Sequence, residues 1–243
     1  MEHELGLTAL FNDHLAGVGN AILSAVGMTA EHPARPWENW LVMEILVVAI
    51  LVVLVTVLST QLSAENPGKI QHLFEALYGF LEHQAHEVGI EHPEKYINYF
   101  GTLFIFLLAM NLIGAFPAFE SPTTTVAVPA GLAVCTFLYY NGMGFAAQGI
   151  GYLKHFAGPL WYMAWLMIPI EIISHLARPL SLTVRLYGNM FGGEQVTGAF
   201  LNLAHLVIPV IFMGLHVFVG LLQTYVFTLL TMIYVSMATA HDH

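Results

Sequence analysis

The chain has 243 residues, of which 57% are hydrophobic and only 9% are charged. A soluble domain usually carries about 25% charged residues, so this chain has too few charges to cover its own surface in water. We therefore expect a polytopic membrane protein. The single cysteine, Cys135, excludes a disulfide scaffold, and the net charge of −10 argues against a nucleic-acid partner.

The first part of the chain predicts one membrane helix between two polar segments. Residues 1–37 are an N-terminal polar segment, expected to form a short helix and a loop. Residues 38–60 hold an apolar run broken only by Glu44, which is long enough to span a bilayer. Residues 61–96 are polar, and an amphipathic surface helix is indicated there by apolar residues at helical spacing, namely Leu73, Leu77, Phe80 and Leu81.

Four more apolar stretches follow, over 97–117, 125–147, 160–201 and 206–238. At about 1.5 Å per residue, a helix of about forty residues is roughly 60 Å long, twice the hydrocarbon thickness of about 30 Å. The last two helices must therefore tilt steeply, kink at Pro169 and Pro179, or run partly along the surface. We expect an all-α polytopic membrane protein, residues 1–243 forming a single membrane domain, with about five membrane helices and a surface helix. The last two helices would form a long, tilted hairpin.

Basic residues orient the predicted helices. Lys69 and Lys95 lie in the first loop between spans and Lys154 in the third, while the second loop has none. Because positive loops stay on the cytoplasmic side, we expect the N-terminus outside and the C-terminus in the cytoplasm.

Polar residues inside the penultimate apolar stretch share one helical face. With 100° per residue, all of them fall within about 40° of Arg185. This polar stripe consists of Glu171, Ser174, Arg178, Ser181, Arg185 and Asn189. A charge at the bilayer centre costs at least about 2.5–3.5 kcal/mol, so such a stripe is expected to face water or a partner.

The last helix carries its own polar face, made of His205, His216, Gln223 and Tyr234. If the chain turns near Ala204–His205, Arg185 lies level with Gln223, and Glu194 lies level with His216. Glu194 itself lies about 180° from Arg185 on a straight helix, so we expect it to face a different cavity.

These groups suit a proton path that contains a barrier. Carboxylates and imidazoles exchange protons near neutral pH once their surroundings tune them, whereas an arginine keeps its proton. We hypothesise that Arg185 is a fixed charge between two aqueous half-channels, which a mobile carboxylate on a partner passes in ionised form. Glu194, His216 and Asn189 would line one half-channel, and Glu171, Ser174 and Ser181 the other.

Simpler interpretations stay open for several residues. Arg185 would be structural if it paired with Glu194, and Glu194 with His216 would form a buried structural pair. Arg178 would anchor at the interface, Glu171 would be merely interfacial, and His175, about 80° off the stripe, would be peripheral. A metal site is the less favoured reading of one His-rich stretch, where a solvated helix face explains His72, His83, His86 and His92.

The run SLTVRLYGNMFGGE, from Ser181 to Glu194, resembles the hallmark of subunit a of the F-type ATP synthase membrane sector. The downstream LLQTYVFTLLTMIYVSMA is similar to the last helix of that family, and PIEIISHLARPLSL and MNLIGAFP also match it. Two departures stand out: Gly114 occupies a position where some relatives carry aspartate, and Ala177 occupies a position that is serine-like.

The resemblance implies a stator that lies beside a rotating ring of c subunits and is held by peripheral-stalk b subunits, in a bacterial inner membrane. Arg185 matches the functional arginine of the family. Its polar proton-path residues correspond to Asn189, Glu194, His216 and Gln223, and Glu171 corresponds to the carboxylate of the cytoplasmic exit. The resemblance implies no cofactor and no covalent catalysis by this subunit.

Two rival functions remain at this stage. A proton-coupled secondary transporter would bind an anionic substrate at Arg185, although transporters usually show two matched halves and this sequence shows no repeat. A membrane oxidoreductase subunit would need paired histidines on facing helices or clustered cysteines, whereas His205 and His216 lie on one helix and Cys135 is alone.

Overall fold

The computed structural model describes residues 5–25, 32–62, 68–116, 119–149, 151–152, 164–203 and 207–239. Over these ranges the chain forms α-helices and two short 3-10 helices and contains no strand. Two helices are long and apolar enough to cross a membrane, α2 (Asn39–Gln61) and α8 (Val207–Thr239). The protein is an all-α polytopic membrane protein, so the predicted fold class is confirmed.

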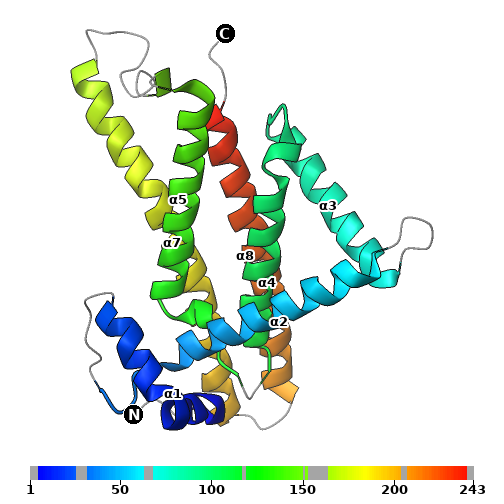
Figure 1. Ribbon diagram of the computed structural model, residues 1–243, viewed down its shortest axis with the longest axis vertical. Coiled ribbons are helices and arrows are strands. Elements are labelled where there is room, and N and C mark those ends of the chain that lie inside the picture. The colour runs from blue at the N-terminus through cyan, green and yellow to red at the C-terminus, as the bar shows by residue number, and fades with distance from the viewer. Residues whose placement is uncertain are drawn as a thin grey trace.

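The centre of the molecule is a bundle in which α4 (Ile97–Ile113) and α5 (Ala127–Gln148) run beside α8 (Figure 1). The helix α7 (Ala164–Leu203) leans across α5 and α8. Large apolar side chains from all four helices fill the core between them, among them Leu107, Tyr140, Leu186 and Phe227. The bundle holds α7 and α8 in a fixed relation.

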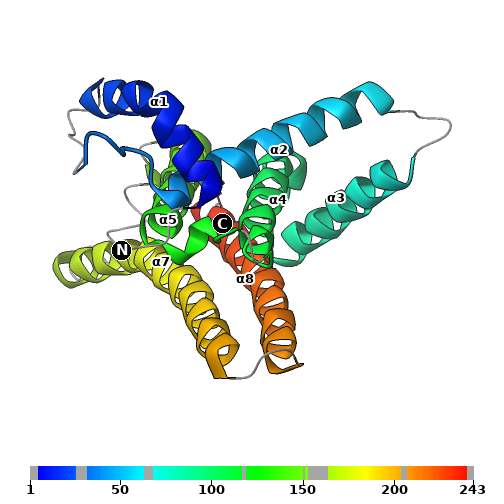
Figure 2. The same ribbon diagram turned by 90° about the horizontal axis from the view of Figure 1, so that it is seen from below.

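The two long helices form the hairpin that the sequence predicts. The helix α7 has 40 residues and α8 has 33. Pro169 and Pro179 lie inside α7, and because proline lacks an N–H and crowds the preceding turn, the helix curves along its length (Figure 2). The expected turn at Ala204–His205 lies outside the described residues.

Three helices lie outside the bundle. The helix α2 crosses it obliquely (Figures 1 and 2). The 20-residue helix α1 (Gly6–Ala25) is held at the start of α2, where Asn12 exchanges two hydrogen bonds with the Trp37 backbone, of 3.0 and 3.1 Å.

The surface helix α3 (Lys69–Glu87) packs on the bundle only through its second half. Leu81 is buried, but Leu73 is 68% exposed and Phe80 is 43% exposed, so the four apolar residues do not form one buried face. The reason is geometric, because the first half of α3 splays away from the bundle together with the end of α2 (Figure 2). Two 3-10 helices, η1 (Pro93–Lys95) and η2 (Pro122–Thr124), lie at opposite ends of α4.

Candidate functional site

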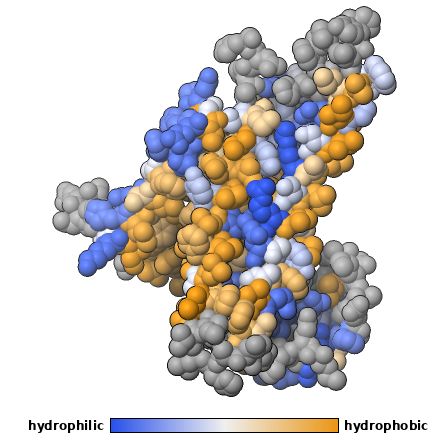
Figure 3. Space-filling model, turned by 180° about the vertical axis from the view of Figure 1, so that it is seen from behind, coloured by the Kyte–Doolittle hydropathy of each residue, from blue (hydrophilic) through white to orange (hydrophobic). Residues whose placement is uncertain are grey.

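The polar stripe lies at the edge of the buried face of α7. Leu182, Leu186 and Met190 are buried on the adjacent side of the helix, whereas the stripe residues at the same level are exposed, namely Ser181, Arg185 and Asn189. On the face of the molecule that carries the hairpin, hydrophilic residues gather between hydrophobic flanks (Figure 3). The half of the predicted stripe from Ser181 to Asn189 is therefore exposed, whereas Glu171, Ser174 and Arg178 are partly buried.

Arg185 has no hydrogen-bond or ion-pair partner among the residues that the structure describes. It points out of the bundle and does not pair with Glu194, so the structural interpretation based on that pair is wrong. An arginine that is neither buried nor paired keeps all five of its N–H donors available. Such a group is suited to meeting an anion from outside the chain.

Gln223 links the two arms of the hairpin one helical turn away from Arg185. Its side-chain oxygen accepts a 2.8 Å hydrogen bond from the Asn189 amide nitrogen. Gln223 is 3% exposed, so this bond is shielded and fixes the register of α7 against α8. Gly193 also lies against His216, which agrees with the predicted level of Glu194 with His216.

A second polar group lies where η2 meets the hairpin, and we call it the Glu194 group. The Glu194 carboxylate lies close enough to Thr124 and Glu120 for both to act on it electrostatically, while the Thr124 hydroxyl donates to the Ser121 carbonyl at 2.7 Å. His216 is buried and packs against Gly193, where a Cβ atom would lie only 2.8 Å from the histidine Nδ1. Glu194 thus faces η2, in a direction different from that of Arg185. His216 lies beside Gly193, the residue that precedes Glu194.

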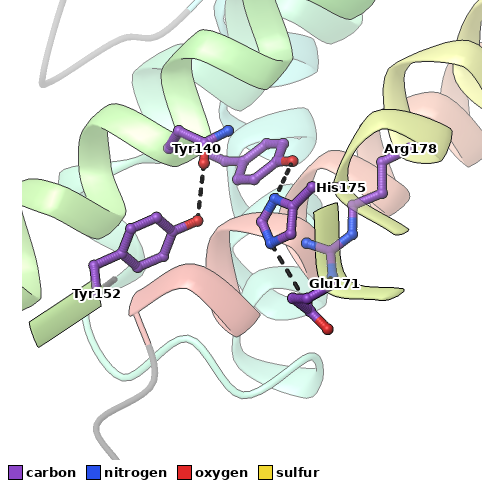
Figure 4. Close-up of polar contacts among 6 residues, drawn as sticks. Tyr140, Tyr152, Glu171, His175 and Arg178 are labelled. Carbon is purple, nitrogen blue, oxygen red and sulfur yellow. Dashed lines mark hydrogen bonds and ion pairs between the residues drawn. The ribbon is translucent and has the colours of Figure 1, made fainter. Parts of the chain in front are cut away.

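A third polar group lies at the opposite end of the bundle, and we call it the His175 cluster (Figure 4). Glu171 Oε1 lies 3.5 Å from His175 Nε2 and 3.9 Å from Arg178 Nη2. On the other side of the imidazole, Nδ1 lies 3.2 Å from the hydroxyl of Tyr140 on α5. His175 is only 7% exposed, so the prediction that it is peripheral is wrong.

Arg178 and Arg185 differ in what surrounds their guanidinium groups. The Arg178 guanidinium carbon lies 5.9 Å from the ring centre of Tyr140 and 5.2 Å from that of Tyr234, in addition to its contact with Glu171. These cation–π and ionic contacts satisfy Arg178 inside the protein. Only Arg185, of the two stripe arginines, is left for an external partner.

Three of the four histidines of the polar 61–96 segment, all except His86, lie in exposed pairs with glutamates. In the described part of the chain, no three side chains of the metal-binding types come together. The pairs are His72–Glu75 at 3.6 Å, His83–Glu87 at 3.3 Å and His92–Glu94 at 3.2 Å. Glu94 also accepts a hydrogen bond from its own backbone N–H, which holds the pKa of that carboxyl below its usual value.

A family model described as ATP synthase A chain matches residues 41–236. The chain belongs to this family. It is 57% identical to the ATP synthase subunit a of Solibacter usitatus (strain Ellin6076) over 235 residues, which is 96% of this chain and 100% of that protein. It is 46% identical to the ATP synthase subunit a of Koribacter versatilis (strain Ellin345), with both chains fully covered.

The ATP synthase A chain family is a membrane-sector family of the ATP synthase, and this places the chain in ATP synthesis and ion transport across a membrane. The matched residues include the whole polar stripe and the polar face of the last helix that the sequence singles out. Membership argues against the secondary transporter and the oxidoreductase subunit as functions for this chain.

Two features of this A chain were not predicted from its sequence. Asn111 on α4 is buried and donates to the Gly220 carbonyl at 3.2 Å and to Thr224 Oγ1 at 3.1 Å, while Thr123 donates to its side-chain oxygen at 2.9 Å. An asparagine deep inside an apolar span is the signal that points to such a network. The partnership of Tyr140 with His175 gives no such signal, because it joins separate helices.

Gly114 also has a structural reason. A Cβ atom at this position would lie 2.8 Å from Ser121 Cβ and 3.1 Å from the Ser121 backbone nitrogen. The segment leading into η2 therefore passes too close to Gly114 to leave room for a side chain there. This chain places its polar groups at that end of the bundle on other residues, above all Glu194.

Proposed function

We propose that this chain is the proton-translocating stator subunit of a rotary F-type ATP synthase. In this proposal it catalyses no covalent reaction and conducts protons to and from the carboxylates of a ring of c subunits. Peripheral-stalk b subunits hold it against the rotation of the ring. The complex lies in a bacterial inner membrane, and the chain needs no cofactor.

The observation that carries the proposal is the contrast between the two arginines of the stripe. Arg178 is satisfied by Glu171 and two tyrosine rings, whereas Arg185 is exposed and without a partner among the described residues. A permanent cation open toward lipid is expensive unless an anion passes it. A ring carboxylate that releases its proton on one side of Arg185 meets this need, because only its ionised form is attracted to the guanidinium.

The positions of the two polar groups support two offset half-channels. Glu171 and Glu194 lie on the same helix, and at about 1.5 Å per residue their separation along its axis is about 35 Å, slightly more than the hydrocarbon thickness of about 30 Å. Each group therefore serves one side of the membrane. Arg185 lies between them, so a proton crosses the middle only while it is bound to the ring.

Lys95 supports an assignment of sides. It lies in η1 at the start of α4, the end of the bundle that also holds the His175 cluster. Because basic loops stay in the cytoplasm, the half-channel of Glu171, Ser174 and Ser181 opens to the cytoplasm. The half-channel of Glu194, His216, Asn189 and Gln223 opens to the outside, where the N-terminus also lies, and the C-terminus is cytoplasmic.

The proposal is tested by ATP-driven proton pumping in vesicles that contain the whole ATP synthase. Replacing Arg185→Ala is expected to abolish pumping while ATP hydrolysis persists, because nothing then separates the half-channels. One proton that crosses 100 mV supplies about 2.3 kcal/mol, and a leak between the half-channels dissipates it. Passive proton flux through vesicles lacking ATP should rise at the same time.

The control is Arg35→Ala, which removes another exposed arginine outside the hairpin. It should pump like the unmodified complex. Normal pumping by the Arg185→Ala complex would remove the basis of the proposal.

A further inference from the structure

His175 lies between Glu171 and Tyr140 at the centre of the His175 cluster, and neither the composition of the stripe nor the resemblance assigns it a role. We propose that His175 is a positioning residue that holds the Glu171 carboxylate in its ionised, proton-accepting orientation. This inference rests on the proposed function, because it concerns one of the half-channels.

The chemistry of the three groups fixes the direction of the hydrogen bonds. An ionised carboxylate only accepts, so the His175 Nε2 that faces Glu171 Oε1 at 3.5 Å must carry a hydrogen. In the neutral imidazole, Nδ1 is then an acceptor, and the Tyr140 hydroxyl at 3.2 Å is its donor. Tyr140 thereby selects the tautomer of His175 that points an N–H at Glu171.

The surroundings of His175 make this arrangement rigid. The ionisable groups in contact with it are Tyr140 from α5 and Glu171 from its own helix. Tyr234 from α8 and Arg178 from α7 form the next layer, because both pack against Tyr140. Tyr140 is 1% exposed and is anchored in the core. The imidazole is therefore tied to a fixed hydroxyl on a neighbouring helix, and it transmits that fixed position to α7.

Glu171 is then held from two directions. Arg178 approaches the same oxygen that His175 approaches, at 3.9 Å, so both donors compete for Oε1 and leave Oε2 for water or an incoming proton. The glutamate side chain is 31% exposed, whereas that of His175 is 8% exposed. The geometry thus keeps the imidazole behind the carboxylate, where it orients Glu171 without itself joining the open stripe.

A double-mutant cycle with a conservative rescue tests this role in the complete ATP synthase in vesicles. His175→Leu, which keeps a side chain of similar size, is expected to lower ATP-driven proton pumping several-fold. His175→Gln should restore most of the rate, because its amide both accepts from Tyr140 and donates toward Glu171. In a Glu171→Gln background, His175→Leu should cause no additional loss.

Tyr140→Phe provides a second arm that keeps the ring and removes only the hydroxyl donor, and it replaces His175→Leu if that variant does not assemble. It should lower pumping in the native background and have no effect in Glu171→Gln. Equal losses in both backgrounds, or a His175→Gln variant as impaired as His175→Leu, would show that the histidine only fills space and would overturn the inference.

The Arg185→Ala complex measured alongside separates the two proposals. If it still pumps, the proposed function fails. If it does not pump and the His175 cycle is additive, only the present inference fails.

Discussion

Gly193 and Gly192 offer a matched pair of substitutions at the scale of single residues. Gly193→Ala brings a methyl group to 2.8 Å from His216 Nδ1, whereas Gly192→Ala meets nothing within 4 Å. Both changes favour the helical state of α7 by up to about 1 kcal/mol, so the difference between them reports the displaced histidine. We expect ATP-driven pumping to fall several-fold in Gly193→Ala and to stay near the unmodified rate in Gly192→Ala.

The contact of Gly193 with His216 is specific to this pair, so equal rates for the two variants would contradict it. A parallel measurement of thermal unfolding should show both variants at least as stable as the unmodified protein, because the gain in helix propensity applies to both. Loss of stability in Gly193→Ala alone would mean that the effect on pumping is a packing defect.

Single residues also show which positions in the site could be predicted from the sequence. The angular positions on α7 correctly separated Glu194 from Arg185, because a helix has a fixed rotation per residue. The assumed turn position also agrees with the contact of Gly193 with His216. It did not predict the hydrogen bond from Asn189 to Gln223, because the register does not state which way a long side chain extends along the helix. The same 80° offset that made His175 seem peripheral places it on the buried face, beside Leu182 and Leu186.

At the scale of elements, Asn111 joins α4 to α8 and to η2. It contributes donors to Gly220 and Thr224 and an acceptor to Thr123. Replacing Asn111→Ala leaves the buried Thr123 hydroxyl with one partner fewer, and an unsatisfied buried polar group costs about 1–3 kcal/mol. We expect a lower unfolding temperature of the detergent-solubilised protein, measured by circular dichroism.

Asn98→Ala is the comparison for this change, because Asn98 lies on the same helix with an exposed side chain. Its unfolding temperature should stay close to that of the unmodified protein. If Asn111→Ala unfolds at the same temperature as Asn98→Ala, the network does not hold α4 against α8.

The surface helix illustrates why elements are easier to predict than their contacts. Leu77 and Leu81 pack against the bundle as their spacing indicates, but Leu73 is exposed. Spacing tells which residues share a face, and it does not tell how far along the helix a neighbour extends. The neighbours of α3 are α4 and, through a 2.7 Å hydrogen bond from the Tyr225 hydroxyl to Gln84 Oε1, α8.

For the whole molecule, the proposal divides the outer surface of α7 into a side that meets water and a side that meets lipid. Ser181 and Leu180 are adjacent and both are exposed. In a Cys135→Ser background, which removes the native exposed thiol, Ser181→Cys should react with a membrane-impermeant thiol reagent in the assembled complex. Leu180→Cys should react far less, because the reactive thiolate does not form in lipid.

The reaction is followed by mass spectrometry of the labelled chain. Similar labelling of the two cysteines would argue that the stripe does not border an aqueous path. Full protection of both, with labelling of a cysteine in the exposed α3, would argue that the ring covers Ser181 without leaving water there.

Composition fixed the class of the molecule because 9% charged residues leave no alternative to a bilayer. Composition does not predict the orientation of α2, since an apolar helix fits a membrane in many orientations and the tilt of the helix depends on the helices around it. The same holds for η2, whose Thr124 faces Glu194 only because a short segment between α4 and α5 folds back over the hairpin.

The open guanidinium of Arg185 also bears on how the complex is assembled. If the proposed function holds, a newly inserted copy that has not met its ring exposes this side chain to hydrocarbon, at a cost of at least about 2.5–3.5 kcal/mol. Union with the ring removes that penalty. Surplus copies made without rotors are consequently the least stable form of the chain, and they are expected to have the shortest lifetime in the cell.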